Sequence, residues 1–171
     1  MATPRAAWAA AEVTIREATD ADAAGVIALI DSCFSDYDGC VMDLPGLDAD
    51  LPAVASRFRE QGGRFWVAEN AGRIVGCVGY VPLDRDTVEL KRLYVARTAR
   101  RQGLASRLLA LVRDAARTHG ARHIDLWSDT RFVEAHAFYL AHGFSQTGAT
   151  RKLDDPSDTT EYAFRGPVEA R

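Results

Sequence analysis

The stretch Val88 to Val112 reads VELKRLYVARTARRQGLASRLLALV and contains an apolar run, a basic turn with a glycine, and an amphipathic segment. In the apolar run, Leu93 and Val95 alternate with polar or aromatic neighbours, as in a strand with one buried face. Leu90 is out of step with Leu93. An extra residue between them would restore the alternation, so the sequence predicts a β-bulge. Bulges are frequent beside active sites, where the freed backbone groups can pair with a ligand.

The basic turn of this stretch opens a helix at about Gly103. The first N–H groups of a helix have no intrahelical partner and the helix dipole adds positive charge there, so such a terminus binds phosphate. Gly103 lets an anion approach closely, and Arg97, Arg100 and Arg101 add positive charge. The arrangement suits a diphosphate, although it is neither a Walker loop nor the three-glycine dinucleotide motif. On spacing alone, an ordinary basic turn between a strand and a helix explains these residues equally well.

The helix after the turn is amphipathic and is expected to end at Gly120, because glycine commonly closes a helix in the left-handed conformation. Its apolar stripe predicts that it packs on a sheet. The residues of this stripe are Leu104, Leu108, Leu111, Val112 and Ala115.

Two motifs occur in the second half of the chain. The first is Arg100-Arg101-Gln102-Gly103-Leu104-Ala105, and the second is Ala135-His136-Ala137-Phe138-Tyr139 followed by Gly143-Phe144. They resemble the (Arg/Gln)-x-x-Gly-x-(Gly/Ala) signature and the A-x-x-F-Y and x-G-F blocks of the GNAT superfamily of acyl-CoA N-acyltransferases. The resemblance covers roughly residues 13–164, although only the second half is specific.

The resemblance implies an α/β (α+β mixed) fold, a mostly antiparallel mixed sheet of six or seven strands with about four helices, splayed at a bulge in the central strand. We expect one GNAT-like acetyltransferase domain over residues 13–166, with a disordered or frayed tail at 1–12 and another tail at 167–171. Local patterns predict strands at 13–18, 64–69, 73–82, 88–95 and 122–128, after 144, and at 161–164. They predict helices at about 20–32, 51–61, 103–120 and 132–142.

The resemblance also implies acetyl-CoA as the acyl donor, a primary amine as the acceptor, and no metal. The freed strand backbone would hold the pantetheine arm, and the turn would hold the diphosphate. The cofactor-binding residues implied in this way are Leu93, Tyr94, Val95, Arg100, Arg101, Gln102, Gly103, Leu104, Ala105 and Ser106.

Amide formation from a thioester and an amine needs a base for the amine and benefits from an acid for the thiolate. By resemblance, Glu89 matches a position where several family members keep a carboxylate base. The alternative is a strand carboxylate paired with Lys91 or Arg92. By the same resemblance, Tyr139 is the acid that protonates the leaving thiolate. Its alternative role is that of a packed aromatic residue.

His136 lies one helical turn before Tyr139 and is an alternative base, although a structural or solvated histidine is the expectation we favour. The chain departs from the family where helices of this kind often carry an asparagine, one to two turns before Tyr139. The residues in its place are Asp129, Thr130, Arg131 and Phe132, and Arg131 could substitute as the cofactor contact.

Residues 33–51 lack clear periodicity and are rich in aspartate, which predicts a solvated acidic loop. In the GNAT pattern this variable region borders the acceptor site. An alternative hypothesis is therefore that Asp36 and Asp38, with Tyr37, face the acceptor pocket and attract a cationic amine.

Composition bounds these hypotheses. The 171 residues are 47% hydrophobic and 26% charged, which is typical of one globular domain with an ample core. A net charge of −3 disfavours a nucleic-acid or membrane-surface partner despite the local arginines. No apolar stretch is long enough to cross a bilayer, and residues 1–12 do not match a secretory signal. The three cysteines show no metal-ligand spacing, which indicates reduced thiols in a cytoplasmic protein.

Three alternatives to acetyl transfer stay open. The motif does not exclude another acyl-CoA, and a non-catalytic acyl-CoA-binding or sensing domain would keep the binding residues without turnover. A nucleic-acid binder that uses the arginine-rich turn is disfavoured by the acidic balance. Many proteins with this resemblance are dimers, so a homodimer is an expected alternative to a monomer, although no interface signature is visible in the sequence.

Overall fold

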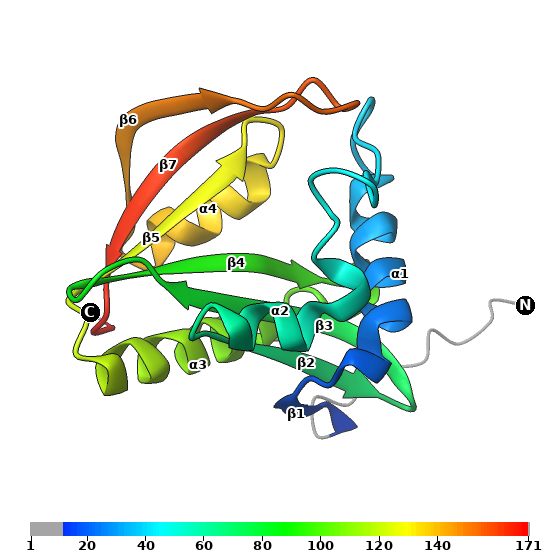
Figure 1. Cartoon of the computed structure of the whole chain (residues 1–171), viewed down its shortest axis with the longest axis horizontal. Helices are drawn as coiled ribbons and strands as arrows, with labels where there is room; N and C mark the ends of the chain where they lie inside the picture. Colours follow the sequence, from blue (N-terminus) through cyan, green and yellow to red (C-terminus); the bar gives the residue numbers. More distant parts are fainter. Residues whose placement is uncertain (1–11, 171) are drawn as a thin grey trace, which may run out of the picture.

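The computed structural model describes residues 12–170, which form one seven-stranded sheet covered by helices on both faces (Figure 1). The sheet order is β1-β2-β3-β4-β5-β7-β6, and β4 and β5 form its parallel pair. The expected fold class, with a mostly antiparallel mixed sheet and about four helices, is confirmed. The strands are β1 (Thr14–Glu17), β2 (Arg64–Asn70), β3 (Arg73–Pro82), β4 (Thr87–Val95), β5 (His123–Asp129), β6 (Ser145–Lys152) and β7 (Thr160–Pro167). The α-helices are α1 (Ala23–Phe34), α2 (Val54–Glu60), α3 (Leu104–His119) and α4 (Val133–Ala141).

The ends of the folded chain differ slightly from the expected boundaries. Nearly all of the expected tail at 1–12 lies outside the described residues. At the other end, β7 continues to Pro167, and Val168 is 5% exposed within the core. Ordered packing therefore extends past residue 166, because the side chain of Val168 fills part of the apolar layer.

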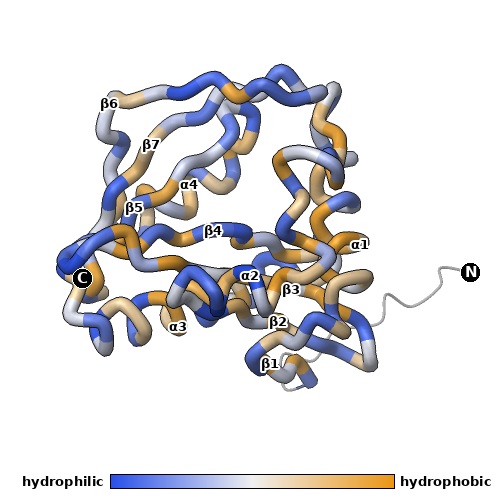
Figure 2. Tube along the Cα trace, in the orientation of Figure 1, coloured by the Kyte–Doolittle hydropathy of each residue, from blue (hydrophilic) through white to orange (hydrophobic). Residues whose placement is uncertain are grey.

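Strands β2 and β3 are buried on both faces over most of their length, which explains their largely apolar sequences (Figure 2). On one face, Trp66 of β2 belongs to the core cluster of α3. On the other face, its neighbour Phe65 packs against Phe58 of α2 with ring centroids 5.0 Å apart. Side chains of β2 thus alternate between two separate cores rather than between core and solvent.

Helix α3 packs on the sheet as predicted, but its buried face is rotated from the expected stripe. Leu109 and Ala116 are fully buried, whereas Leu111 and Ala115 are only partly buried. The expected end is confirmed, because Gly120 closes the helix with φ 85°.

Two glycines of β3 allow helices to approach the sheet closely on opposite faces. A Cβ at Gly76 would lie 3.2 Å from side-chain atoms of Leu104 and Leu108. A Cβ at Gly79 would lie 2.4 Å from the ring of Phe58. Both glycines therefore mark close packing, and the β3 register shift also lies between Cys77 and Gly79.

Truncation of Leu108 to alanine is expected to lower the free energy of unfolding by about 3 kcal/mol, because this fully buried side chain fills the space above Gly76. Leu140→Ala is the matched control, since Leu140 is 56% exposed on α4 and its loss should change stability by less than about 0.5 kcal/mol. Urea unfolding measures both values. Equal losses in the two variants would contradict this assignment of the core.

The predicted bulge lies in β4, and the sheet splays beside it. Gly79 pairs with Lys91 and Cys77 pairs with Tyr94, so β4 has one more residue than β3 across this interval. Arg92 within the bulge has φ 59°. The strands β4 and β5 pair only at Thr87 to Glu89, although both continue further (Figure 1). The unpaired halves of these strands diverge and leave room for two cavities.

Candidate active site

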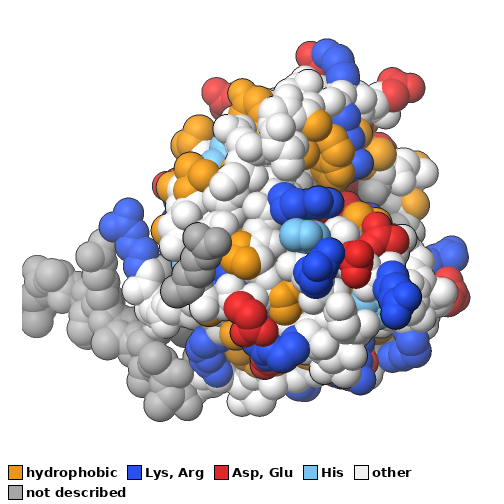
Figure 3. All heavy atoms as spheres, turned by 90° about the vertical axis from the view of Figure 1, so that its left-hand side faces the viewer, with side chains coloured by type: hydrophobic (Ala, Val, Ile, Leu, Met, Phe, Trp, Pro, Cys, Tyr) orange, Lys and Arg blue, Asp and Glu red, His pale blue; other side chains and the backbone are white. Residues whose placement is uncertain are grey.

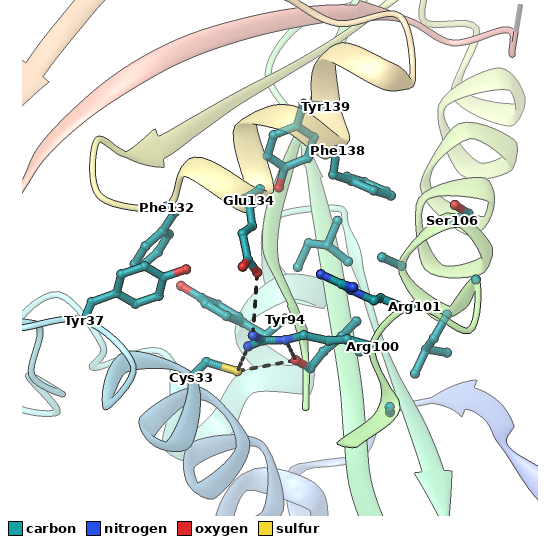
Figure 4. A pocket seen from close by; sticks show the side chains of 17 residues that line it. Cys33, Tyr37, Tyr94, Arg100, Arg101, Ser106, Phe132, Glu134, Phe138 and Tyr139 are labelled. Atoms are coloured by element: carbon teal, nitrogen blue, oxygen red, sulfur yellow. Dashed lines mark hydrogen bonds and ion pairs between the residues drawn. The ribbon is translucent and has the colours of Figure 1, made fainter. Parts of the chain in front are cut away.

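The first cavity lies between β4, the turn before α3, and α4, and has a volume of about 390 Å³ (Figure 4). Of the cofactor-binding residues expected from the sequence, Gln102 is not among those that line it, and its side-chain amide donates to the Thr98 carbonyl at 3.4 Å. The expected residues that line this cavity are Leu93, Tyr94, Val95, Arg100, Arg101, Gly103, Leu104, Ala105, Ser106 and Tyr139.

The beginning of α3 presents free backbone donors to this cavity. Gly103 is the N-cap residue with φ 76°, and the first helical bond runs from the Arg107 N–H to the Gly103 carbonyl at 3.1 Å. Among residues 12–170, no acceptor is bonded to the backbone N–H groups from Gln102 to Ser106. Glycine adopts this left-handed conformation without steric cost. The resulting turn directs these N–H donors together toward the first cavity. The terminus is therefore suited to bind an anion.

The three arginines of the turn have different environments, which the sequence did not distinguish. Arg100 donates through Nε to the Val95 carbonyl at 3.0 Å, and its guanidinium lies 3.5 Å from an Asp36 oxygen. Arg97 is also paired with Asp36. Within the described part of the chain, Arg101 has no ion pair, and it lines the cavity. Arg101 is thus the best placed of the three to meet an anion.

The backbone of the bulge is only partly free, contrary to the simple expectation for Leu93 and Val95. Leu93 has no partner residue on β3. The Val95 carbonyl already accepts the Arg100 Nε bond and a weaker contact from the Cys33 thiol at 3.7 Å. Arg100 can donate to this carbonyl because the chain reverses in the turn and places the Arg100 side chain beside the end of β4 (Figure 4).

Tyr139 lies in a wall that the two cavities share, with its hydroxyl directed into the first (Figure 4). The residue is 6% exposed, and its hydroxyl has no hydrogen-bond partner in the part of the protein that the structure describes. Burial raises the pKa of Tyr139 above its usual range, because desolvation disfavours the phenolate. The side chain is therefore a neutral donor aimed at the site.

The second cavity, of about 380 Å³, continues from this wall between β4, β5 and the segments around residues 40–48 and 151–161. Glu89 lines it and is partly buried. The described residues give Glu89 no ion pair, because Arg92 instead binds Asp48 and Asp50 at 2.6 Å each. The strand ion pair that was the alternative for Glu89 is thus absent between these residues.

The acidic residues that line the second cavity do not include Asp36 and Asp38, which were expected from the loop at residues 33–51 to face an acceptor pocket. Asp36 pairs with arginines beside the first cavity, and Tyr37 lines that cavity. The side chain of Asp38 lines neither cavity, so the structure does not bring the three residues together at the second cavity. The carboxylates that line the second cavity are Asp43, Asp48, Glu89, Asp129, Asp155 and Glu161.

His136 is a structural residue, as favoured. Its Nε2 lies 3.0 Å from the Asp129 carbonyl, and its ring packs 5.3 Å from that of Phe164. Burial lowers the pKa of His136. The neighbouring Arg131 forms a bidentate pair with Asp129, so it is engaged with a residue of the second cavity rather than with the first cavity.

Several lining residues of the first cavity were not predicted. Phe138 belongs to the late motif, and its neighbour Tyr139 could have indicated its position. Glu134 and Cys33 carried no local signal, because they reach the cavity through tertiary packing of α4 and α1. Burial raises the pKa of the Cys33 thiol, so this group stays protonated near neutral pH.

A membrane span would be visible in the helices, and a patch of one charge would be visible on the surface. Within residues 12–170, no helix has the length and apolar character needed for a membrane span. The face shown in Figure 3 carries acidic and basic side chains close together.

The profile of the acetyltransferase (GNAT) family matches residues 26–144, which is more than half of the chain. The match includes the splayed strands, the anion-binding turn and the helix of Tyr139. The chain therefore belongs to the GNAT family of acetyltransferases.

Individual relatives agree with this family. The chain is 39% identical to human N-acetyltransferase 8 over 98 residues, which are 54% of this chain and 43% of that protein. It thus spans less than half the length of that relative. A GNAT family acetyltransferase from Staphylococcus aureus Mu50 superposes with a TM-score of 0.78 at 23% identity, over 92% of this chain and 99% of that chain. A GNAT family acetyltransferase from Elizabethkingia anophelis with acetyl-CoA bound gives a TM-score of 0.62 at 19% identity, over 91% and 98%.

Proposed function

We propose that the protein is an N-acetyltransferase that moves an acetyl group from acetyl-CoA to a primary amine on a small molecule. The observation that carries this proposal is the position of the Tyr139 hydroxyl, which is neutral, lies in a wall between two cavities, and has no hydrogen-bond partner among residues 12–170. Within the same residues, one cavity has N–H donors without an acceptor, and the other has a carboxylate without an ion pair. Donor and acceptor would therefore meet beside an acid.

We assign acetyl-CoA to the first cavity. The free N–H groups from Gln102 to Ser106 and the guanidinium of Arg101 are suited to its diphosphate. The apolar wall of Leu93, Val95 and Phe138 is suited to its pantetheine arm. Arg100 keeps a supporting role, because it fixes the end of β4 through the Val95 carbonyl.

In the proposed reaction, Glu89 takes a proton from the acceptor ammonium, directly or through a water molecule. The amine nitrogen then attacks the thioester carbonyl, forming the C–N bond while the C–S bond breaks. Tyr139 donates its proton to the departing sulfur. The nitrogen of the new amide then loses its surplus proton, which passes through water to the Tyr139 phenolate, a strong base because of its raised pKa, and Glu89 releases its own proton to solvent.

Direct attack is favoured over an acyl-enzyme intermediate. Cys33 is the thiol that lines the cofactor cavity, but it is 5% exposed and its pKa is raised by burial. A thiol is a poor nucleophile compared with a thiolate. The free amine is therefore the better attacking group.

The acceptor is proposed to be a cationic amine. Among the groups that line the second cavity, six carboxylates face three cations. Arg92 and Arg151 are both bound to carboxylates, and Asp129 is paired with Arg131, which leaves Asp43, Glu89 and Asp155 without a cationic partner among the described residues. This charge balance favours a positively charged substrate over an anionic one.

The proposal is tested by acetyl-CoA-dependent thiol release with a panel of amines. Release that requires both acetyl-CoA and an amine supports the transferase. Faster release with another acyl-CoA supports the alternative acyl donor, and binding without release for any amine supports the sensing domain.

Glu89→Gln is expected to lower kcat/KM by about a hundredfold, since the amide cannot accept the proton of the amine. Glu60→Gln is the control, because Glu60 is exposed on α2 and pairs with Arg57 at 3.4 Å, away from both cavities. Initial rates of thiol release and calorimetric titration with acetyl-CoA separate turnover from binding. Unchanged kcat/KM in Glu89→Gln would assign the base to another group, such as a water molecule.

Other expectations remain predictions. We propose a single acetyltransferase domain that covers residues 13–166 together with the packed Pro167 and Val168, in a cytoplasmic protein without nucleic-acid or membrane partners and without a metal. A homodimer remains the alternative to a monomer.

A further inference from the structure

A serine and a histidine meet at the edge of the first cavity. Ser106 lies in the first turn of α3, lines the cavity, and has a free backbone N–H. Its Oγ is 2.9 Å from Nε2 of His142, the residue that follows α4. The His142 ring also stacks on Phe138, another lining residue, with centroids 4.1 Å apart. The two residues link the beginning of α3 to the end of α4.

The hydrogen bonds around the ring fix its proton positions. Nδ1 of His142 lies 2.8 Å from the Phe138 carbonyl, which can only accept a hydrogen bond. Nδ1 must therefore carry a hydrogen. In the neutral imidazole, Nε2 is then an acceptor, so the Ser106 hydroxyl donates its hydrogen to Nε2. The lone pairs of Oγ are the part of the hydroxyl left for a ligand.

Protonation of the ring reverses this bond. Both nitrogens of the imidazolium are donors, so Nε2 donates to Oγ and the hydrogen of Ser106 becomes free. That hydrogen can then donate to an anion that already lies against the neighbouring N–H groups. The positive charge of the ring lies behind the same hydroxyl and attracts the anion further.

We propose that His142 is a positioning residue for the cofactor, which determines whether Ser106 offers a hydrogen or a lone pair to the coenzyme's diphosphate. This inference rests on the proposed function, since it takes the first cavity to bind coenzyme A. The coenzyme then binds more tightly to the protein with protonated His142 and takes up a proton as it binds.

The charged and titratable groups around His142 lie on the elements that pack against it. On α3, the Arg113 guanidinium donates to the His142 carbonyl at 2.6 Å. Glu169, near the C-terminal end, acts on the charge of Arg113. On α4, Tyr139 contacts His142 through its backbone carbonyl, and burial raises the pKa of its phenol. A buried phenol and a guanidinium keep their charge states between about pH 5.5 and 8, so neither changes the charge at this contact over that range.

The direction of the effect follows from linkage. The protein takes up a proton when it binds a ligand that prefers the protonated ring. The affinity is greatest below the pKa of the free protein and falls as pH rises through it. The fall ends above the pKa of the complex. A difference of about tenfold between the two limits corresponds to a shift of one pKa unit.

Calorimetric titration with dephospho-coenzyme A between about pH 5.5 and 8 tests the proposal. This probe lacks the 3′-phosphate, whose second ionisation near pH 6 would otherwise contribute its own pH dependence. For the unmodified protein, the dissociation constant should rise about tenfold across the range. Titrations in two buffers of different ionisation enthalpy should show proton uptake near the midpoint.

Three variants isolate the contact. Ser106→Ala should weaken the affinity and reduce the pH dependence to the part that the charge of the ring supplies by itself, because no hydroxyl remains to be oriented. His142→Gln should give a flat profile, nearer the tight limit, because its amide N–H can donate to Ser106 at every pH. His119→Gln is the matched control. His119 is exposed and contacts the Asp84 carbonyl at the far end of α3, so this variant should keep the full pH dependence.

Two results would overturn the inference. The first is a flat profile for the unmodified protein that binds the probe. The second is an equal slope in Ser106→Ala. Both leave the proposed function intact, since the probe still binds. If neither coenzyme A nor the probe binds at any pH, the assignment of the first cavity fails, and the proposed function fails with it.

Discussion

Replacement of Gly103 by tryptophan is expected to weaken acetyl-CoA binding by more than about a hundredfold. Gly103 is the N-cap residue of α3, and a Cβ built on it meets no atom within 4 Å, so the indole can occupy the open side. That side is where the free N–H groups from Gln102 to Ser106 would meet the diphosphate. The side chain would therefore block the anion without a clash inside the fold. Calorimetric titration with acetyl-CoA measures the loss.

The other end of the same helix provides the control. Gly120 has φ 85°, close to the 76° of Gly103, and a Cβ there also meets nothing within 4 Å. Gly120→Trp carries the same left-handed strain of about 1 kcal/mol and the same bulk. It should bind acetyl-CoA as the unmodified protein does. Equal loss in both variants would attribute the effect to the strain of the helix end and would contradict the cofactor assignment.

Replacement of Tyr139 by phenylalanine is expected to lower kcat by about a thousandfold and to leave acetyl-CoA binding within about twofold. The hydroxyl has no hydrogen-bond partner in the described structure, so its removal breaks no contact and should not lower stability. What is lost is the proton donor for the departing thiolate. Steady-state rates of thiol release, together with calorimetry, separate the two effects.

Tyr80→Phe is the matched control for this prediction. Tyr80 is also buried, at 7% exposure, and stacks on Trp66 of β2 away from the first cavity. It should retain full activity. The raised pKa of Tyr139 adds a second test, because activity of the unmodified protein should show no loss from phenol ionisation up to about pH 10. A kcat for Tyr139→Phe within threefold of the unmodified value would exclude Tyr139 as the acid.

The position of the bulge could be predicted because it changes the phase of a short apolar pattern. Leu90 and Leu93 cannot share one face of a regular strand, and the extra residue observed between Lys91 and Tyr94 resolves this conflict. The buried face of α3 was predicted less well. Its core residues Leu109 and Ala116 were missed. A residue at the edge of the apolar stripe of a helix is buried only if a strand of the sheet packs against it, and the helix sequence does not specify this.

The second cavity could not be predicted from local patterns. Its carboxylates come from segments that are distant in the sequence, such as Asp43, Glu89 and Asp155. The aspartates of the loop at residues 33–51 look alike in the sequence, but the structure gives them different partners. Asp48 binds Arg92 of the bulge, whereas Asp36 binds arginines of the turn. Ion pairing depends on distance in space, and a run of aspartates does not specify it.

The sequence by itself determined the features that a few consecutive residues define: the bulge in β4, the glycine at the start of α3, and the motif of Tyr139 on α4. These follow from backbone conformation and side-chain spacing, which are local properties. Tertiary structure alone decided which side chains meet across the splayed sheet. Pairing of β4 with β5 ends at Glu89, and this divergence opens the cavities. It also decided that Ser106 meets His142, because packing of α3 beside α4 is a property of the whole fold.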